Sequence, residues 1–275
     1  MIQPDFIVIG SMKSGTTSLY RWLAAHPDVG MSRDKETDYF IAERAYSRGP
    51  AWYSAQFEPG RKVYGEASPN YTKVDDFRGV PSRIRAALPH VRLVYLVRDP
   101  AARFMSQYRH SWTMGEISMT PAELPRTDQY THILNTSRYA RQVEAYLEEF
   151  DRDRLLIVDF DEMIHTPDRT LETVQRFIGV EPRPIVANEV YNDNADVARV
   201  PAPILRFAQT PLGRSLSRVV SREARDRIRG LVAVRKPRQP PPFPQSVQDR
   251  IRDDLRQDAD RFRQISGRAF ERWSV

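Results

Sequence analysis

The stretch GSMKSGTTSL at residues 10–19 decides the fold. It follows DFIVIG (5–10), a short apolar run rich in β-branched side chains, which is typical of a buried strand. Leu19, Trp22 and Leu23 then recur at helical spacing. Strand, glycine loop and helix in this order predict a loop that binds phosphate, because backbone N–H groups at the start of such a helix attract anions.

The lysine of this loop is not where a nucleotide-triphosphate loop, G-x-x-x-x-G-K-[ST], would have it. Gly10 and Gly15 keep the spacing, but Thr16 occupies the lysine position and Lys13 lies inside the loop. Only five of the 42 basic residues of this chain are lysines, so one at this place is notable. We expect Lys13 and the backbone at Gly15 to contact a bound phosphate.

Hydroxyl groups add to the donors of the loop. Ser14, Thr16 and Thr17 are each candidates to donate to the same phosphate. A kinase or ATPase would also need an aspartate for Mg²⁺, but the next apolar run exits through Arg98 before Asp99. The pattern predicts an anion site that uses cations in place of a metal; the alternative is a glycine turn with surface hydroxyls.

The rest of the chain alternates between strands and helices. Further strands are predicted at 62–67, 91–97 and 155–160, and further helices at 82–88, 137–150, 167–178 and 245–265. This alternation predicts an α/β fold with a central parallel sheet flanked by helices, in one domain over residues 1–275. Residues 195–243 are irregular and rich in Arg and Pro, with helical pieces near 202–208 and 221–232.

Composition limits the functional classes. The net charge of +6 suits an anionic ligand, a nucleic acid or an anionic surface, although a coding preference for arginine gives the same balance. There is no cysteine, and the five histidines show no metal-ligand spacing, so we expect no metal. No run approaches the roughly 20 apolar residues that span a membrane, and no signal peptide is recognised. A cytoplasmic protein is the simplest expectation.

A second anion site is predicted in LVRDPAARFMSQY (96–108). Arg98 follows a central strand, at the edge where open α/β sheets bind ligands, and Ser106 lies two turns into the next helix. An arginine and a hydroxyl that converge there suit a second phosphate. The alternative is that Asp99 caps the helix and pairs with Arg98.

Together, GSMKSGTTSLYRWLAAHPDV, LVRDPAARFMSQY and the C-terminal GRAFERW resemble the PAPS-dependent sulfotransferase family, whose donor is 3′-phosphoadenosine 5′-phosphosulfate. The resemblance extends over essentially the whole chain and is to the bacterial and heparan-sulfate-type members. It implies a P-loop-like sulfotransferase fold. It also implies that the first loop binds the 5′-phosphosulfate and that Arg98 and Ser106 bind the 3′-phosphate. Lys13 would then reach the oxygen that bridges phosphorus and sulfur.

The acceptor side is implied by SRDKETDYF (32–40). It resembles the family segment whose glutamate removes the acceptor proton, and the matching residue is Glu36. Asp38 stands where some relatives have histidine, and we keep it as an acceptor-binding candidate. Without the resemblance, these residues would be read as a solvated charged loop.

Three further positions follow from the resemblance. In GEASPNY (65–71), Ala67 replaces a family lysine, and Glu66 is either an acceptor-binding residue or a strand-end residue paired with an arginine. In VRKPRQPPPFP (234–244), Lys236 and Arg238 match basic positions of a loop that covers the nucleotide; the alternative is an exposed basic linker. His110 follows the second motif and is a candidate to approach the acceptor.

The reaction predicted from these residues is sulfuryl transfer from PAPS to a hydroxyl of a small-molecule or carbohydrate acceptor, with release of 3′-phosphoadenosine 5′-phosphate (PAP). Glu36 acts as the base and Lys13 stabilises the leaving oxygen. Two rival classes remain open: a P-loop kinase, and a non-catalytic protein that binds anions or nucleic acid. We expect no nucleic-acid partner, because no binding motif is recognised. The acceptor, the aromatic residue that stacks on adenine and the oligomeric state cannot be read from the sequence.

Overall fold

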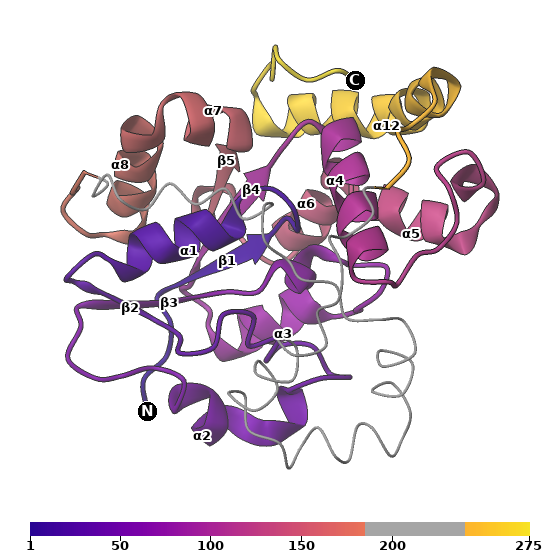
Figure 1. Ribbon diagram of the computed structural model, residues 1–275. Coiled ribbons are helices and arrows are strands. Elements are labelled where there is room, and N and C mark those ends of the chain that lie inside the picture. Colours follow the sequence, from indigo (N-terminus) through magenta and orange to yellow (C-terminus); the bar gives the residue numbers. More distant parts are fainter. Residues whose placement is uncertain (185–239) are drawn as a thin grey trace, which may run out of the picture.

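The computed structural model describes residues 1–184 and 240–275 of the 275-residue chain (Figure 1). Its centre is a five-stranded sheet in the order β2-β3-β1-β4-β5, and every neighbouring pair is parallel. The strands are β1 (Phe6–Gly10), β2 (Val29–Met31), β3 (Val63–Ala67), β4 (Arg92–Val97) and β5 (Leu155–Asp159). The predicted fold class is confirmed: a central parallel sheet flanked by helices.

Both faces of the sheet are covered, as continuous apolar strands require. Phe6 and Val8 of β1 face one core with helices α1 (Thr16–Ala24) and α8 (Pro167–Ile178). Ile7 and Ile9 face the opposite core with α3 (Val80–Ala87) and α6 (Tyr139–Leu147). The side chains of β1 alternate between the two cores because successive residues of a strand point to opposite faces.

The remaining helices extend these two cores and form a third. They are α2 (Gly49–Ser54), α4 (Pro100–Thr113), α5 (Asp128–Asn135), α7 (Phe160–His165) and α12 (Gln245–Ser266). Single-turn 3₁₀ helices lie at η1 (Tyr46–Arg48), η2 (Pro69–Thr72), η3 (Leu124–Arg126) and η4 (Arg152–Arg154). The last helix, α12, lies against α4 and α6 (Figure 1), so the C-terminal part of the chain supports the helices that follow β4.

The C-terminal GRAFERW segment folds back onto this framework. Trp273 is buried, stacks on Phe270 with ring centroids 4.1 Å apart, and lies near Phe262 of α12. The backbone N–H of Ser274 donates to the carboxylate of Asp99, which also caps α4 by accepting from Ala102 N at 2.8 Å. The end of the described chain is therefore tied to the start of α4.

The predicted elements lie within a few residues of their expected positions. The strand expected at 62–67 is β3, the helix expected at 137–150 is the shorter α6, and the helix expected at 245–265 is α12. The helical pieces expected near 202–208 and 221–232 lie outside the described residues. The expectation of a single domain over the whole chain stays a prediction. No helix in the described ranges is long and apolar enough to cross a membrane.

Candidate active site

The phosphate loop connects β1 to α1 with two residues in the left-handed backbone region. Lys13 has φ = 70° and Gly15 has φ = 89°. A Cβ atom on Gly15 would come within 2.9 Å of the Phe160 ring, so both the backbone conformation and the close packing require glycine there. Thr16 begins α1 directly after the loop. The loop therefore has the strand-loop-helix geometry that the sequence predicts.

The hydroxyl groups of the loop differ in their exposure to solvent. Ser14 is fully buried, and its Oγ lies 2.6 Å from Ser11 Oγ, which is also buried. Thr16 is buried as well, whereas Lys13 and Thr17 are partly exposed. In this conformation the Ser14 hydroxyl contacts Ser11, with either oxygen as the possible donor, and its contact with a phosphate stays a prediction.

A buried arginine donates a hydrogen bond to the backbone of the phosphate loop. The Arg103 side chain of α4 has no exposed surface, and all five of its N–H groups are used. They donate to Ser137 Oγ, Met12 O, Gln107 Oε1, Ile133 O and Thr136 Oγ1, at 2.7–3.3 Å. Burial lowers the pKa of Arg103 to about 10. Because each acceptor is a neutral oxygen, no carboxylate within the described ranges neutralises this charge.

Arg98 lies at the carboxyl end of β4, as expected. Its guanidinium carbon lies 4.8 Å from the centroid of the Phe160 ring, and its backbone N–H donates to Tyr139 Oη at 3.3 Å. Asp99 caps α4, as the alternative interpretation predicts. Among the described residues, however, Arg98 forms no ion pair with Asp99. The Phe160 ring thus lies against the Arg98 guanidinium, and the contact of Arg98 with a 3′-phosphate stays a prediction.

Ser106 lies on α4 and is partly exposed, and its hydroxyl forms no hydrogen bond in the described part of the chain. It remains a candidate for the 3′-phosphate. The other two donor-binding candidates, Lys236 and Arg238, lie outside the described residues, so the predicted nucleotide-covering loop stays untested.

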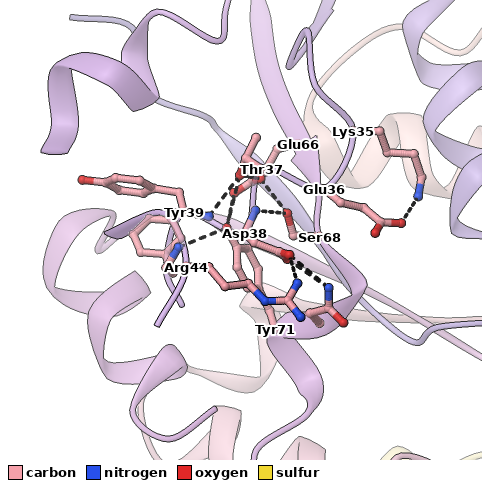
Figure 2. Close-up of polar contacts among 11 residues, drawn as sticks. Lys35, Glu36, Thr37, Asp38, Tyr39, Arg44, Glu66, Ser68 and Tyr71 are labelled. Carbon is pink, nitrogen blue, oxygen red and sulfur yellow. Dashed lines mark hydrogen bonds and ion pairs between the residues drawn. The ribbon is translucent and has the colours of Figure 1, made fainter. Parts of the chain in front are cut away.

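On the acceptor side, Glu36 lies in a turn beside the end of β3. Its backbone N–H donates to Ala67 O at 2.9 Å, and its φ is +66°. The side chain is 46% exposed and pairs with Lys35 Nζ at 2.6 Å. Figure 2 shows the carboxylate directed toward Lys35 and away from the polar cluster around Glu66. Glu36 is therefore an accessible carboxylate on a fixed backbone.

Asp38 and Glu66 differ from the expectation of acceptor-binding residues. Asp38 is buried, pairs with Arg44, and accepts from Asn70 Nδ2 at 3.1 and 3.2 Å (Figure 2). Burial raises the pKa of Asp38, and the Arg44 guanidinium acts in the opposite direction. Both of its oxygens are occupied, so this carboxylate is arranged to stabilise the turn that carries Glu36.

Glu66 is completely buried, and four hydroxyl groups donate to its two carboxylate oxygens. The donors are Thr37, Tyr53, Ser68 and Tyr71. Burial raises the pKa of Glu66, and these hydrogen bonds act against that rise. Since no arginine pairs with it in the described ranges, the expected strand-end ion pair is not formed. The carboxylate has no surface to offer to an acceptor.

His110 lies in the last turn of α4 and is partly buried. Burial lowers its pKa first and the Lys13 ammonium lowers it further, while Glu116 and Glu36 act in the opposite direction. The charges of Lys13 and Glu36 thus both affect the pKa of His110, so this side chain lies close to both predicted catalytic residues. A lowered pKa keeps His110 neutral near pH 7, where it can accept a proton.

Two residues near the site were not predicted. Phe160 follows β5 and packs against both Gly15 and Arg98; its place after a strand end was the available signal. Lys73 follows η2 and is partly buried; burial lowers its pKa, and Asp76 opposes this effect. The described residues also form a cavity of about 440 Å³ between Asp159 and Arg268, which none of the predicted site residues lines.

Comparison with known proteins agrees with this geometry. A family model described as the sulfotransferase domain matches residues 3–196. The chain belongs to the PAPS-dependent sulfotransferase family. The family expectation drawn from the motifs is thus confirmed.

Several sulfotransferases are similar to this member of the family. The bifunctional heparan sulfate N-deacetylase/N-sulfotransferase of Drosophila melanogaster is 28% identical over 208 residues, which are 65% of this chain and 20% of that protein. Heparan sulfate glucosamine 3-O-sulfotransferase 5 of Mus musculus is 27% identical over 202 residues, covering 69% and 57% of the two chains. A sulfotransferase structure from Alicyclobacillus acidocaldarius shares the fold over the full length of both chains, with a TM-score of 0.71 and 18% identity.

This sulfotransferase spans about a fifth of the first relative and somewhat more than half of the second. The acceptors of those longer proteins are properties of those proteins.

Proposed function

We propose that the protein transfers a sulfuryl group from PAPS to a hydroxyl of a carbohydrate or small-molecule acceptor. One observation carries the proposal: the loop with Lys13 and the turn with Glu36 are attached to the ends of neighbouring parallel strands. Val8 of β1 is in register with Ala67 of β3, and Ala67 O accepts from Glu36 N. Lys13 and Glu36 therefore lie at the same edge of the sheet, which supports a shared site with a cation for the leaving oxygen and a carboxylate for the acceptor proton.

The proposed residue roles follow from this arrangement. Loop amides and Lys13 hold the 5′-phosphosulfate, while Arg98 and Ser106 hold the 3′-phosphate. Glu36 takes the proton of the acceptor hydroxyl as that oxygen forms a bond to sulfur. The bond from sulfur to the bridging oxygen breaks, and PAP leaves with the bonding electrons. Lys13 stabilises the negative charge that develops on the bridging oxygen.

The relatives named above support a carbohydrate as the first acceptor to examine. Their names describe heparan sulfate and glucosamine as acceptors. The screen should therefore include unsulfated glucosamine-containing oligosaccharides beside phenols and aliphatic alcohols. Radiolabelled PAPS and mass spectrometry would detect the product. We expect at least one acceptor to gain one sulfuryl group with stoichiometric release of PAP.

Glu36→Gln tests the proposed base in the same assay. Glutamine keeps the size of the side chain but cannot take the proton, so turnover should fall by roughly 10²–10⁴-fold. Glu43→Gln is the matched control, because Glu43 is exposed on the same segment. Wild-type turnover by Glu36→Gln would transfer the role to His110. Phosphate transfer from ATP with Mg²⁺, or DNA binding without turnover, would instead support one of the rival functions.

A further inference from the structure

Three consecutive backbone amides after Glu36 and Thr37 are held by hydroxyl groups. Each amide donates to a different side chain, and two of these side chains come from the end of β3 and from η2. The pairs are Asp38 N with Ser68 Oγ at 3.1 Å, Tyr39 N with Thr37 Oγ1 at 3.3 Å, and Phe40 N with Tyr71 Oη at 3.2 Å. The backbone that leaves the turn is therefore fixed residue by residue.

The same three hydroxyl groups donate their own protons to Glu66 (Figure 2). Thr37 and Ser68 donate to Oε2, the latter at 2.9 Å, and Tyr71 donates to Oε1 at 3.0 Å. Each hydroxyl thus connects the buried carboxylate to one backbone amide. Glu66 is thus linked to the backbone amides of residues 38–40 through these hydroxyl groups and not by direct hydrogen bonds.

The charge of Glu66 sets the direction of all three connections. An ionised carboxylate only accepts hydrogen bonds, so it takes the single O–H of each hydroxyl and leaves their lone pairs for the backbone amides. A glutamine would place its NH₂ group either against Thr37 and Ser68 or against Tyr53 and Tyr71. In either orientation at least one connecting hydroxyl could no longer donate to position 66 and would turn its O–H group toward its backbone amide. A carboxylate at position 66 accepts from all three connecting hydroxyls at once, which leaves each of them an oxygen lone pair for its backbone amide.

The turn that this network holds is strained. Glu36 has φ = +66° and Asp38 has φ = +48°, one on each side of Thr37. Residues other than glycine stay in this region only when the surrounding structure fixes them, and such residues cluster at functional sites. Thr37 is buried between the two and carries one of the three connections.

We propose that Glu66 is a positioning residue, which holds the Glu36 carboxylate in place through Thr37, Ser68 and Tyr71. The inference rests on the proposed role of Glu36 as the base. The expected signature of this role is a loss of turnover without a loss of donor binding, because none of the three hydroxyls belongs to the phosphate loop.

The first test needs no acceptor. Thr37→Val keeps the side-chain volume but removes one connection, Ser68→Ala removes another, and Thr37→Ser keeps the hydroxyl. Tyr53→Phe is the matched control, since Tyr53 donates to Glu66 Oε1 at 2.6 Å but connects to none of these amides. Hydrogen exchange of residues 36–40 should quicken roughly tenfold in Thr37→Val and Ser68→Ala, and stay near wild type in Thr37→Ser and Tyr53→Phe. Equal exchange in Thr37→Val and Tyr53→Phe would overturn the inference.

The second test measures turnover with the acceptor found by the screen. Thr37→Val should lower kcat by roughly ten- to a hundredfold at unchanged PAP affinity, because misplacement of a reacting group by about 1 Å has this effect. Thr37→Ser should recover most of the loss. In a Glu36→Gln background, Thr37→Val should cause no further loss. If the loss persists there, the positioning role is wrong although Glu36 can still be the base. If Glu36→Gln itself is fully active, Glu36 is not the base and the inference fails with that assignment, while sulfuryl transfer by the protein still stands.

Discussion

The Nη1 group of Arg103 donates a hydrogen bond to the carbonyl oxygen of Met12 at 3.3 Å, which ties helix α4 to the phosphate loop. The same guanidinium is buried and holds α5 and the residues before α6 through its other bonds. A single side chain thus joins the elements that carry both predicted phosphate sites. The conformation of the phosphate loop therefore depends on the buried Arg103 guanidinium.

We expect Arg103→Lys to destabilise the protein. Lysine keeps the charge but has three donors in a different geometry, so buried acceptors such as Ser137 Oγ and Ile133 O lose their partners. The free energy of unfolding should fall by about 3 kcal/mol. Urea unfolding would measure this fall, with Arg109→Lys as the control because Arg109 is exposed on the same helix. Equal stability of the two variants would show that the network around Arg103 contributes little.

The second prediction concerns donor recognition at the end of β4. PAP should bind at least tenfold more tightly than AMP, because Arg98 and Ser106 have no phosphate to contact in AMP and such charge-assisted contacts contribute about 1.5–3 kcal/mol each. Arg98→Ala should remove most of this preference. Isothermal titration calorimetry with both nucleotides measures it. Equal affinities in the wild-type protein would remove the assignment of the 3′-phosphate site.

The third prediction concerns pH and the packing of α12 on α6. Asp258 accepts from the backbone N–H groups of Ala140 and Arg141, both at 3.1 Å. Burial raises the pKa of Asp258 to about 6, although the two amide hydrogen bonds oppose the rise. The folded protein therefore holds this proton more tightly than the unfolded chain, in which aspartate titrates near about 4. Through this group, stability should fall as the pH rises from about 4 to 6.

Asp258→Asn should remove this part of the pH dependence. Between about pH 4 and 7, the wild-type protein should lose about 1–2 kcal/mol relative to the variant, less than the full shift implies because Asp258 is partly exposed. Urea unfolding at both pH values gives the difference, with Asp253→Asn as the control on the exposed face of α12. A parallel pH dependence of wild type and Asp258→Asn would contradict the prediction.

The sequence predicts the fold well because the deciding signals are local. Apolar runs such as 91–97 indicate strands, and glycines such as Gly15 indicate the loops that follow them. The parallel topology is predicted from the alternation of strands with helices. The strand β2 has only three residues, Val29–Met31, too few to show a period. Its parallel pairing with β3 identifies it as a strand, and this pairing is seen only in the structure.

The candidate site is less predictable because its determinants are distant in sequence. Glu66 reads as a strand-end carboxylate, but its four hydroxyl partners come from three separate segments. Arg103 lies between Arg98 and Ser106 in the sequence, and its burial has no local signal, because the oxygens that accept from it come from the phosphate loop, from α4 and from residues 133–137. The positive φ of Glu36 has no sequence signal, because it depends on the surrounding hydrogen bonds.

The last prediction returns to the lysine inside the phosphate loop. Lys13→Ala should lower the single-turnover rate by roughly 10²-fold but weaken the binding of PAP by less than about tenfold. The reason is that negative charge on the bridging oxygen grows as its bond to sulfur breaks. A cation aimed at that oxygen contributes more in the transition state than in the ground state, and only this difference raises the rate.

Two further measurements separate this role from a simple phosphate contact. Lys13→Arg should restore little activity, because a planar guanidinium does not replace a compact ammonium at a loop residue with φ = 70°. Added Mg²⁺ should not restore Lys13→Ala, since both carboxylate oxygens of Asp99, the aspartate that follows β4, already accept from Ala102 N and Ser274 N. The rate and the PAP dissociation constant are to be measured side by side for wild type and both variants. If they change by the same factor, Lys13 only anchors the phosphate, and its place inside the loop has no special part in sulfuryl transfer.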